Sequence, residues 1–275
     1  MKIVTFLKNI SFCIFFVFCL YLIMLFFKKI LDFKYYKEAF SDKKIEIVIA
    51  RFQENIDWLN NYPFSQYPVI VYNKGNNNGV KINNLKQIHN IKNIGRESHS
   101  YLYHIIRNYD NLADITIFLP GSADNTHKIS RSTRLIEEIA SNNQAVFIGQ
   151  KYNDVKNDLY SFELKNYNAT NSENTQINPS SKLSESTISP FGKWFESIFK
   201  NIKIQHVSYN SIFSISKEDI LQHPKSYYQH LINELTTENP EQGHYFERSW
   251  EAVFYPLNNT KYIDLDIIDE NNHFL

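Results

Sequence analysis

The longest apolar run of the chain lies near its N-terminus, from residue 10 to residue 27, and contains no charged side chain. About 18 residues are just enough for an α-helix to cross the roughly 30 Å hydrocarbon core of a membrane. A cleaved signal peptide is the main alternative, but the run exceeds the usual apolar region of such peptides and lacks a small-x-small cleavage site. The pattern predicts an N-terminal transmembrane anchor with its neck over residues 1–44.

The side of the membrane on which the rest of the chain lies stays open. Four lysines follow the apolar run within ten residues and two precede it, and this excess favours a cytoplasmic domain. In a secretory lumen, by contrast, the Asn-x-Thr triplets at residues 168–170 and 258–260 would be glycosylation acceptors. We therefore expect a single-pass membrane protein of unassigned orientation.

Past the neck, short β-branched apolar runs alternate with segments whose apolar residues recur every three or four positions. The first kind is typical of buried strands and the second of helices with one buried face. Expected strands lie at 45–50, 68–72, 115–119, 145–149 and 211–216; expected helices lie at 96–109, 130–140, 217–221, 224–235 and 244–254, with a helical turn at 54–59. This alternation favours an α/β domain with a mostly parallel sheet and helices on both faces.

The domain is expected as one unit over residues 45–257, because a chain of this length suits one substantial core. A stretch at about 151–189 is rich in Asn, Ser, Thr and Lys and indicates a long polar surface insertion, part of it mobile. Residues 258–275 form a C-terminal tail.

Composition narrows the classes of function. The 29 basic side chains balance the 29 acidic ones, so nothing favours a nucleic acid partner. Both cysteines, Cys13 and Cys19, lie inside the apolar run. The domain therefore has no disulfide, no Cys-ligated zinc and no catalytic thiolate.

Ligands of open α/β sheets bind at the carboxyl ends of the strands, so the loops that leave the strands hold the candidate residues. Basic side chains beside glycine turns at a helix N-terminus suit a phosphate group. Arg96 is the first choice for that role, and an ion pair of Arg96 with Glu97 is the alternative. The candidates for donor binding are Arg51, Asn73, Lys74, Gly95, Arg96, Glu97 and Lys193.

The last expected helix carries a second polar group. His244, Glu247 and Arg248 lie on one face of it, opposite apolar residues that include Trp250. Glu247 beside the two basic residues would act as a general base toward a sugar hydroxyl. The pair of Glu247 and Arg248 would otherwise be a buried ion pair that fixes the helix, and the sequence leaves both possibilities open.

The case for a metal ion is thin. Asp124, in the loop after the strand at 115–119, is a weak candidate ligand, and a requirement for magnesium or manganese stays open. Positive charge from Lys74, Arg96, Lys193 or Arg248 could replace a metal ion at a diphosphate leaving group. The sequence contains no Gly-x-Ser-x-Gly, phosphate-binding loop or His-Glu-x-x-His motif, which weakens hydrolase, triphosphatase and zinc-protease interpretations.

Several blocks of sequence stand out together. They are Ile47-Val48-Ile49-Ala50-Arg51, Asp57-Trp58-Leu59, Val71-Tyr72-Asn73-Lys74-Gly75, Asn93-Ile94-Gly95-Arg96-Glu97-Ser98-His99, Tyr101-Leu102-Tyr103-His104-Ile105, Pro190-Phe191-Gly192-Lys193-Trp194 and Gly243-His244-Tyr245-Phe246-Glu247-Arg248-Ser249-Trp250. In this order they resemble the signatures of domain-of-unknown-function family 3431, from about Glu46 to Phe254. That family is regarded as glycosyltransferase-like, with a fold similar to the A-type glycosyltransferases that bind nucleotide-sugars.

The resemblance implies transfer of a sugar from a nucleotide-sugar donor to a glycan or another hydroxyl acceptor. Trp194 and Trp250 would then either stack on sugar rings or belong to the core. In one departure, Pro120-Gly121 stands where the family tends to carry Gln-Gly, which removes a side-chain amide from the expected site. A non-catalytic glycan- or nucleotide-binding module and an anchored structural partner are the alternative functions.

Overall fold

The computed structural model describes residues 23–24, 43–76, 80–154, 159–166 and 183–265. The chain divides into two units, residues 1–43 and 44–275. Of the expected membrane anchor only Ile23 and Met24 are described, as part of a helix; the rest lies outside the described residues. Within the described ranges, no helix combines the length and the apolar character needed to span a membrane.

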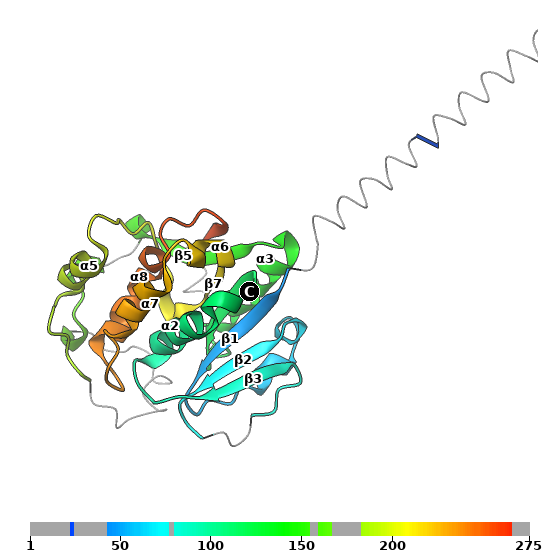
Figure 1. The fold of residues 1–275 in the computed structure, drawn as a ribbon, viewed down its shortest axis with the longest axis horizontal. Coiled ribbons are helices and arrows are strands. Elements are labelled where there is room, and N and C mark those ends of the chain that lie inside the picture. Colours follow the sequence, from blue (N-terminus) through cyan, green and yellow to red (C-terminus); the bar gives the residue numbers. More distant parts are fainter. Residues whose placement is uncertain (1–22, 25–42, 77–79, 155–158, 167–182, 266–275) are drawn as a thin grey trace, which may run out of the picture. The chain divides into compact units, whose positions relative to one another are not determined.

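The second unit is a mixed α/β domain built on a five-stranded sheet (Figure 1). Its strands are β1 (Ile45–Arg51), β2 (Val69–Asn73), β3 (Leu85–Asn90), β4 (Ile115–Pro120) and β7 (Phe213–Ser216). Their order is β3-β2-β1-β4-β7, and only the β4–β7 pair is antiparallel. The expected mostly parallel sheet is therefore present.

A second sheet of three strands continues beside β7. It contains β5 (Ala145–Lys151), β6 (His206–Val207) and β8 (Thr260–Asp264) in the order β6-β5-β8. The Ser214 hydroxyl joins β7 to β5, because it accepts from the Val146 N–H at 2.7 Å and donates to the Val146 carbonyl at 3.0 Å. At this junction between the two sheets, the hydrogen bonds of a side chain thus take the place of backbone hydrogen bonds between strands.

Helices cover both faces of the central sheet, because successive strand residues point to opposite sides. Val48 and Ala50 face a core shared with α2, α5, α7 and α8, whereas Ile47 and Ile49 face a core shared with α3. The α-helices are α2 (Arg96–Asn108), α3 (Ile129–Asn142), α5 (Phe191–Phe199), α6 (Lys217–Leu221), α7 (Lys225–Ile232) and α8 (Glu241–Val253).

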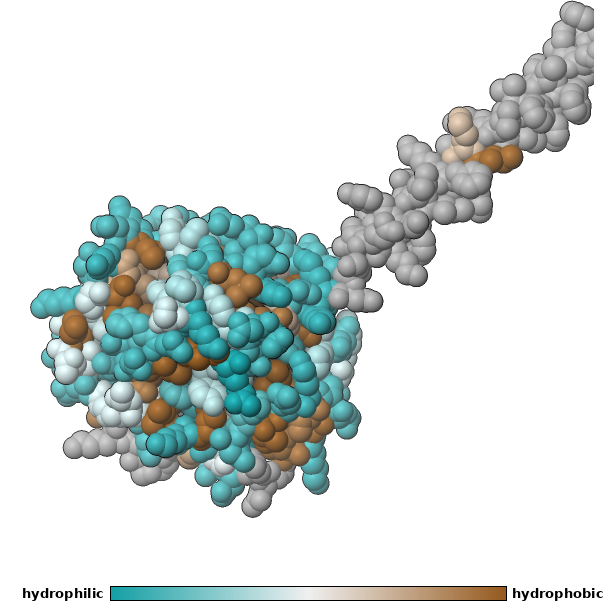
Figure 2. Space-filling view, viewed as in Figure 1, coloured by the Kyte–Doolittle hydropathy of each residue, from teal (hydrophilic) through white to brown (hydrophobic). Residues whose placement is uncertain are grey.

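Short 3₁₀ turns fill the connections. They are η1 (Asp57–Asn60), η2 (Phe64–Gln66), η3 (Tyr109–Asn111), η4 (Tyr152–Asp154), η5 (Leu159–Ser161), η6 (Leu164–Asn166) and η7 (Tyr209–Ser211). The face of the domain in view is mainly hydrophilic, with scattered apolar residues (Figure 2).

Several elements differ from the sequence interpretation, which did not list α5 or β6 among the expected elements. Strand β3 was not expected, because its Lys86, Gln87 and His89 break the apolar pattern of a buried strand, as an edge position allows. Helix α8 begins at Glu241 instead of His244, with Gly243 inside its first turn. The expected tail contains β8, which pairs parallel with β5.

Candidate functional site

The strand order reverses between β1 and β4, because β1 leads to β2 and β3 on one side while β4 lies on the other. In open α/β sheets such a switch point, at the carboxyl ends of the strands, is where ligands bind. Here the two strand ends are tied together. The Gly121 N–H donates to the Ala50 carbonyl at 2.7 Å, and the Trp58 indole donates to the Gly121 carbonyl at 3.2 Å.

Helix α2 begins beside this edge with two residues in the left-handed conformation, Gly95 at φ 63° and Arg96 at φ 51°. Gly95 has no space for a side chain, since an added Cβ would lie 2.6 Å from the Cβ of Leu235. The Lys74 ammonium stabilises the turn by donating to the carbonyls of Ile94, at 2.5 Å, and of Arg96. Lys74 is therefore a positioning residue for the start of α2.

The Lys74 ammonium is also poorly solvated. Burial lowers the pKa of Lys74 to about 7, although the nearby Glu97 carboxylate opposes the shift. A neighbouring Arg96 adds to the lowering. Lys74 is therefore only partly protonated at neutral pH, and the approach of an anion would favour its charged form.

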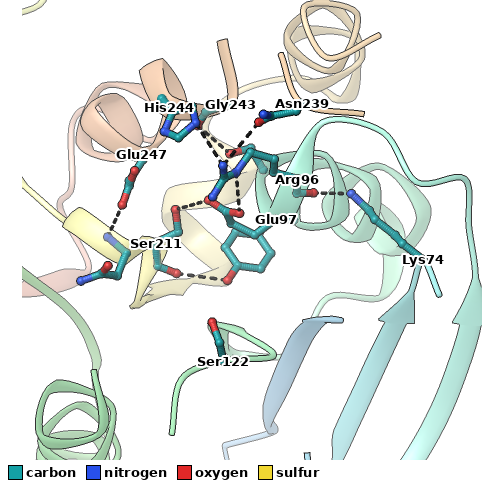
Figure 3. A network of polar contacts seen from close by, with 12 residues as sticks. Lys74, Arg96, Glu97, Ser122, Ser211, Asn239, Gly243, His244 and Glu247 are labelled. Carbon is teal, nitrogen blue, oxygen red and sulfur yellow. Dashed lines mark hydrogen bonds and ion pairs between the residues drawn. The ribbon is translucent and has the colours of Figure 1, made fainter. Parts of the chain in front are cut away.

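Arg96 connects α2 to α8 (Figure 3). Its Nη1 donates to Nε2 of His244 at 3.0 Å and to Oδ1 of Asn239 at 3.4 Å. A guanidinium can only donate, so His244 accepts as a neutral imidazole. Burial, with the charges of Arg96 and Arg248, keeps the pKa of His244 well below its ordinary value. Gly243 leaves space for this contact, because its added Cβ would lie 3.2 Å from Cδ of Arg96.

Two carboxylates from different helices meet at one turn. Oε1 of Glu97 accepts from the Ser211 hydroxyl at 3.3 Å, and Oε1 of Glu247 accepts from the Asn210 N–H at 2.5 Å. Asn210 and Ser211 are themselves left-handed, at φ 67° and 55°. Strained backbone of this kind in non-glycine residues persists where the surroundings hold it, and it concentrates at functional sites.

Arg248 lies behind Glu247. Its guanidinium stacks 3.4 Å from the ring centre of Phe162, and Nη1 donates to the His244 carbonyl at 2.9 Å. Oε2 of Glu247 is 3.8 Å from Nη1 of Arg248, a long ion pair. Arg248 is only 8% exposed. Its main role is therefore to hold Phe162, a described residue of the polar insertion, against α8.

Near the loop after β4, Lys128 pairs with Ser122, and the sequence did not single out this lysine. Nζ of Lys128 donates to the Ser122 hydroxyl at 2.9 Å, and Lys128 is only 6% exposed. Burial lowers the pKa of Lys128, while the charges of Glu97 and Glu247 oppose this shift. In a lysine-rich chain no local signal marks Lys128, because its burial depends on the tertiary packing of α3.

Several expected site residues have other roles. Arg51 and Asn73 are buried against each other, with Nη1 of Arg51 2.6 Å from Oδ1 of Asn73, and hold the strand ends. Lys193 is exposed on α5. Trp194 and Trp250 are both 0% exposed and belong to the core, so they cannot stack on a sugar in this conformation.

The surroundings of Asp124 do not support it as a metal ligand. Asp124 is exposed in the loop after β4. In the part of the chain that the structure describes, no three His, Cys, Asp or Glu side chains form a group that fits a metal ion.

The fold and the site define an α/β protein with a mixed-charge site at the switch point of its parallel strands. The family model described as "Protein of unknown function (DUF3431)" matches residues 47–263, and the chain belongs to this family. The match covers the described strands from β1 to β8 and all of the site residues above. No curated protein matches the chain.

Proposed function

We propose that this chain is a membrane-anchored glycosyltransferase-like enzyme that transfers a sugar from a nucleotide-sugar to a hydroxyl acceptor. Three kinds of support bear on it: the apolar N-terminal run, the resemblance to a glycosyltransferase-like family, and a charged site at the edge of the sheet where α/β folds bind ligands. An A-type glycosyltransferase fold is part of the same proposal.

The convergence of Arg96, Glu97 and Glu247 carries the proposal. Arg96 and Glu97 begin α2, whereas Glu247 comes from α8, and the turn at 210–211 holds both carboxylates (Figure 3). A sugar transferase needs a cation for the departing diphosphate and a carboxylate for the attacking hydroxyl. Both chemical types are present here within one network.

We assign the roles as follows. Arg96 faces the diphosphate, with its guanidinium oriented by His244 and the turn below it held by Lys74. Glu247 accepts the proton of the acceptor hydroxyl through Oε2, since Oε1 is occupied by the Asn210 N–H. Arg248 fixes the helix face that presents Glu247.

The replacement Glu247→Gln tests the assignment of the base. It keeps the shape and the hydrogen bond from Asn210 but removes the proton acceptor, so transfer should fall at least ~100-fold, the usual contribution of general base catalysis. Donor affinity should stay within about threefold. The measurement is product formation together with donor binding by calorimetry.

The exposed Glu196 on α5 provides the matched control, because Glu196→Gln makes the same chemical change far from the network. Its turnover should equal that of the natural chain. Unchanged turnover in Glu247→Gln would remove Glu247 from the mechanism.

One observation favours a second function, a non-catalytic nucleotide- or glycan-binding module. Both carboxylate oxygens of Glu247 already have partners in the protein, the Asn210 N–H and Arg248, which makes them less available to an acceptor hydroxyl. A binder would be stabilised by a nucleotide-sugar without hydrolysing or transferring it. Slow donor hydrolysis would exclude this alternative.

A further inference from the structure

The buried ammonium of Lys128 has no direct ion pair among the described residues, although the carboxylates of Glu97, Glu247 and Glu54 act on it at longer range. Among the residues that the structure describes, Nζ of Lys128 forms a hydrogen bond with the Ser122 hydroxyl and no ion pair. Its side chain is almost completely removed from solvent. A buried charge without a counterion is unfavourable, so either the lysine loses its proton or an anion binds to it.

The position of this pair decides between these two possibilities. Ser122 follows β4 directly after Gly121, and Gly121 is bonded to the end of β1. The pair therefore lies at the switch point, and the Ser122 hydroxyl points toward the Arg96–Glu97 network (Figure 3). An anion there would contact the buried Lys128 and the partly buried Ser122 together.

Three nearby carboxylates act on Lys128, those of Glu97, Glu247 and Glu54, and each of them already accepts a hydrogen bond from another residue. The negative charge of Glu97 is offset by Arg96, whose Nε lies 3.6 Å from Oε2 of Glu97, and by a hydrogen bond from the Ser211 hydroxyl. Glu247 is offset by Arg248 and the Asn210 N–H. Lys128 has no direct ion pair of this kind among the described residues, so its positive charge is offset only by carboxylates at longer range.

We propose that Lys128 and Ser122 form a diphosphate-binding subsite at the carboxyl end of β4. Lys128 would supply the charge and Ser122 a hydrogen bond to a phosphate oxygen. The diphosphate is the part of the proposed nucleotide-sugar donor that this edge would bind, and in that respect the subsite rests on the proposed function. The binding of a diphosphate itself is independent of any sugar transfer.

The experiment uses inorganic pyrophosphate and the full-length chain. Ser122→Asp places a carboxylate beside Lys128 and gives it an internal counterion, whereas Ser122→Asn is the neutral control of nearly equal size. We expect Ser122→Asp to raise the melting temperature and to weaken pyrophosphate binding at least tenfold. Ser122→Asn removes the same hydroxyl without adding a charge, so its pyrophosphate affinity should exceed that of Ser122→Asp at least tenfold.

Lys128→Met is the direct variant and should also lose at least tenfold in pyrophosphate affinity, with Lys193→Met as the exposed control. If Lys128→Met does not fold, the two Ser122 variants still decide the question. Equal pyrophosphate affinity in Ser122→Asp and Ser122→Asn, or no binding by the natural chain, would overturn the subsite.

Nucleotide-sugars separate the two proposals. Pyrophosphate binding that depends on Lys128, without response to any nucleotide-sugar, would keep the subsite and reject the proposed function. Sugar transfer that is unchanged in Ser122→Asp would keep the function and reject the subsite.

Discussion

Gly95 is the residue on which the geometry of the site depends most directly. Its left-handed conformation turns the chain into α2, and its missing side chain lets Leu235 and His99 approach. The turn places Arg96 against His244 and Glu97 against Ser211. A single backbone conformation therefore orients the positive and the negative group of the site together.

The variant Gly95→Ala should destabilise the domain strongly. An L-residue in this conformation costs about 1–2 kcal/mol, and the new Cβ would also collide with Leu235. Gly243→Ala is the matched control, because its Cβ meets only the flexible side chain of Arg96. Urea unfolding should show a large loss for Gly95→Ala and little change for Gly243→Ala; equal losses would contradict this explanation.

The residues of the site were only partly predictable. Arg96, Glu97 and Glu247 stand out in sequence because a charged residue follows a glycine turn or shares a helix face with other polar groups. Lys128 gives no such signal, and the burial of Trp194 and Trp250 follows from packing among aromatic rings of α5 and α8. Burial of a single side chain is a tertiary property that local pattern does not encode.

At the scale of elements, a cluster of polar residues around His206 connects β8 to β6. Nε2 of His206 is 2.9 Å from Oδ1 of Asp264, and Oε2 of Glu251 accepts from the N–H of His206 at 2.7 Å. The Tyr262 hydroxyl donates to Oε1 of Glu251 at 2.8 Å, and Lys151 lies 2.6 Å from Asp264. One helix and three strands therefore meet at His206.

This polar cluster should make the unfolding free energy of the domain depend on pH. Burial opposes protonation of His206, but the carboxylates of Glu251, 4.0 Å from Nδ1, and of Asp264, 2.9 Å from Nε2, outweigh it and raise the pKa of His206. The folded state then binds the proton more tightly than the unfolded state, so the stabilisation is complete below about pH 6.5 and is lost as the pH rises above it.

His206→Gln is the variant that isolates this effect. The difference in unfolding free energy between the natural chain and His206→Gln should be larger at pH 5.5 than at pH 8.5. Denaturant unfolding at the two pH values measures it. A difference that grows with pH would contradict the assigned direction of the pKa.

The elements that sequence predicted best are those in which local pattern and burial agree. β1, β2, β4 and β5 are β-branched runs buried on both faces, and Ser216 caps α6 by accepting from the Asp219 N–H at 3.0 Å. β3 was missed because an edge strand keeps polar side chains. The start of α8 was missed because Gly243 serves the contact with Arg96 instead of ending a helix.

At the scale of the whole molecule, an apolar N-terminal run precedes in sequence a domain that has a charged site at the edge of its sheet. The order β3-β2-β1-β4 brings the loops after β1 and β4 together, and α2 and α8 add their polar residues to the same edge. Membership of DUF3431 adds no activity, because this is a family of unknown function. The proposed function therefore rests on one claim, that this edge binds a nucleotide-sugar.

Thermal unfolding of the full-length chain with a panel of nucleotide-sugars tests that claim most directly. A ligand at 100 times its Kd stabilises the folded state by about 2.7 kcal/mol, which corresponds to a rise of roughly 5–10 °C in Tm for a domain of this size. We expect one donor to give such a rise in the natural chain and no rise in Arg96→Met. The absence of a rise with every donor would contradict the account, as would an equal rise in Arg96→Met.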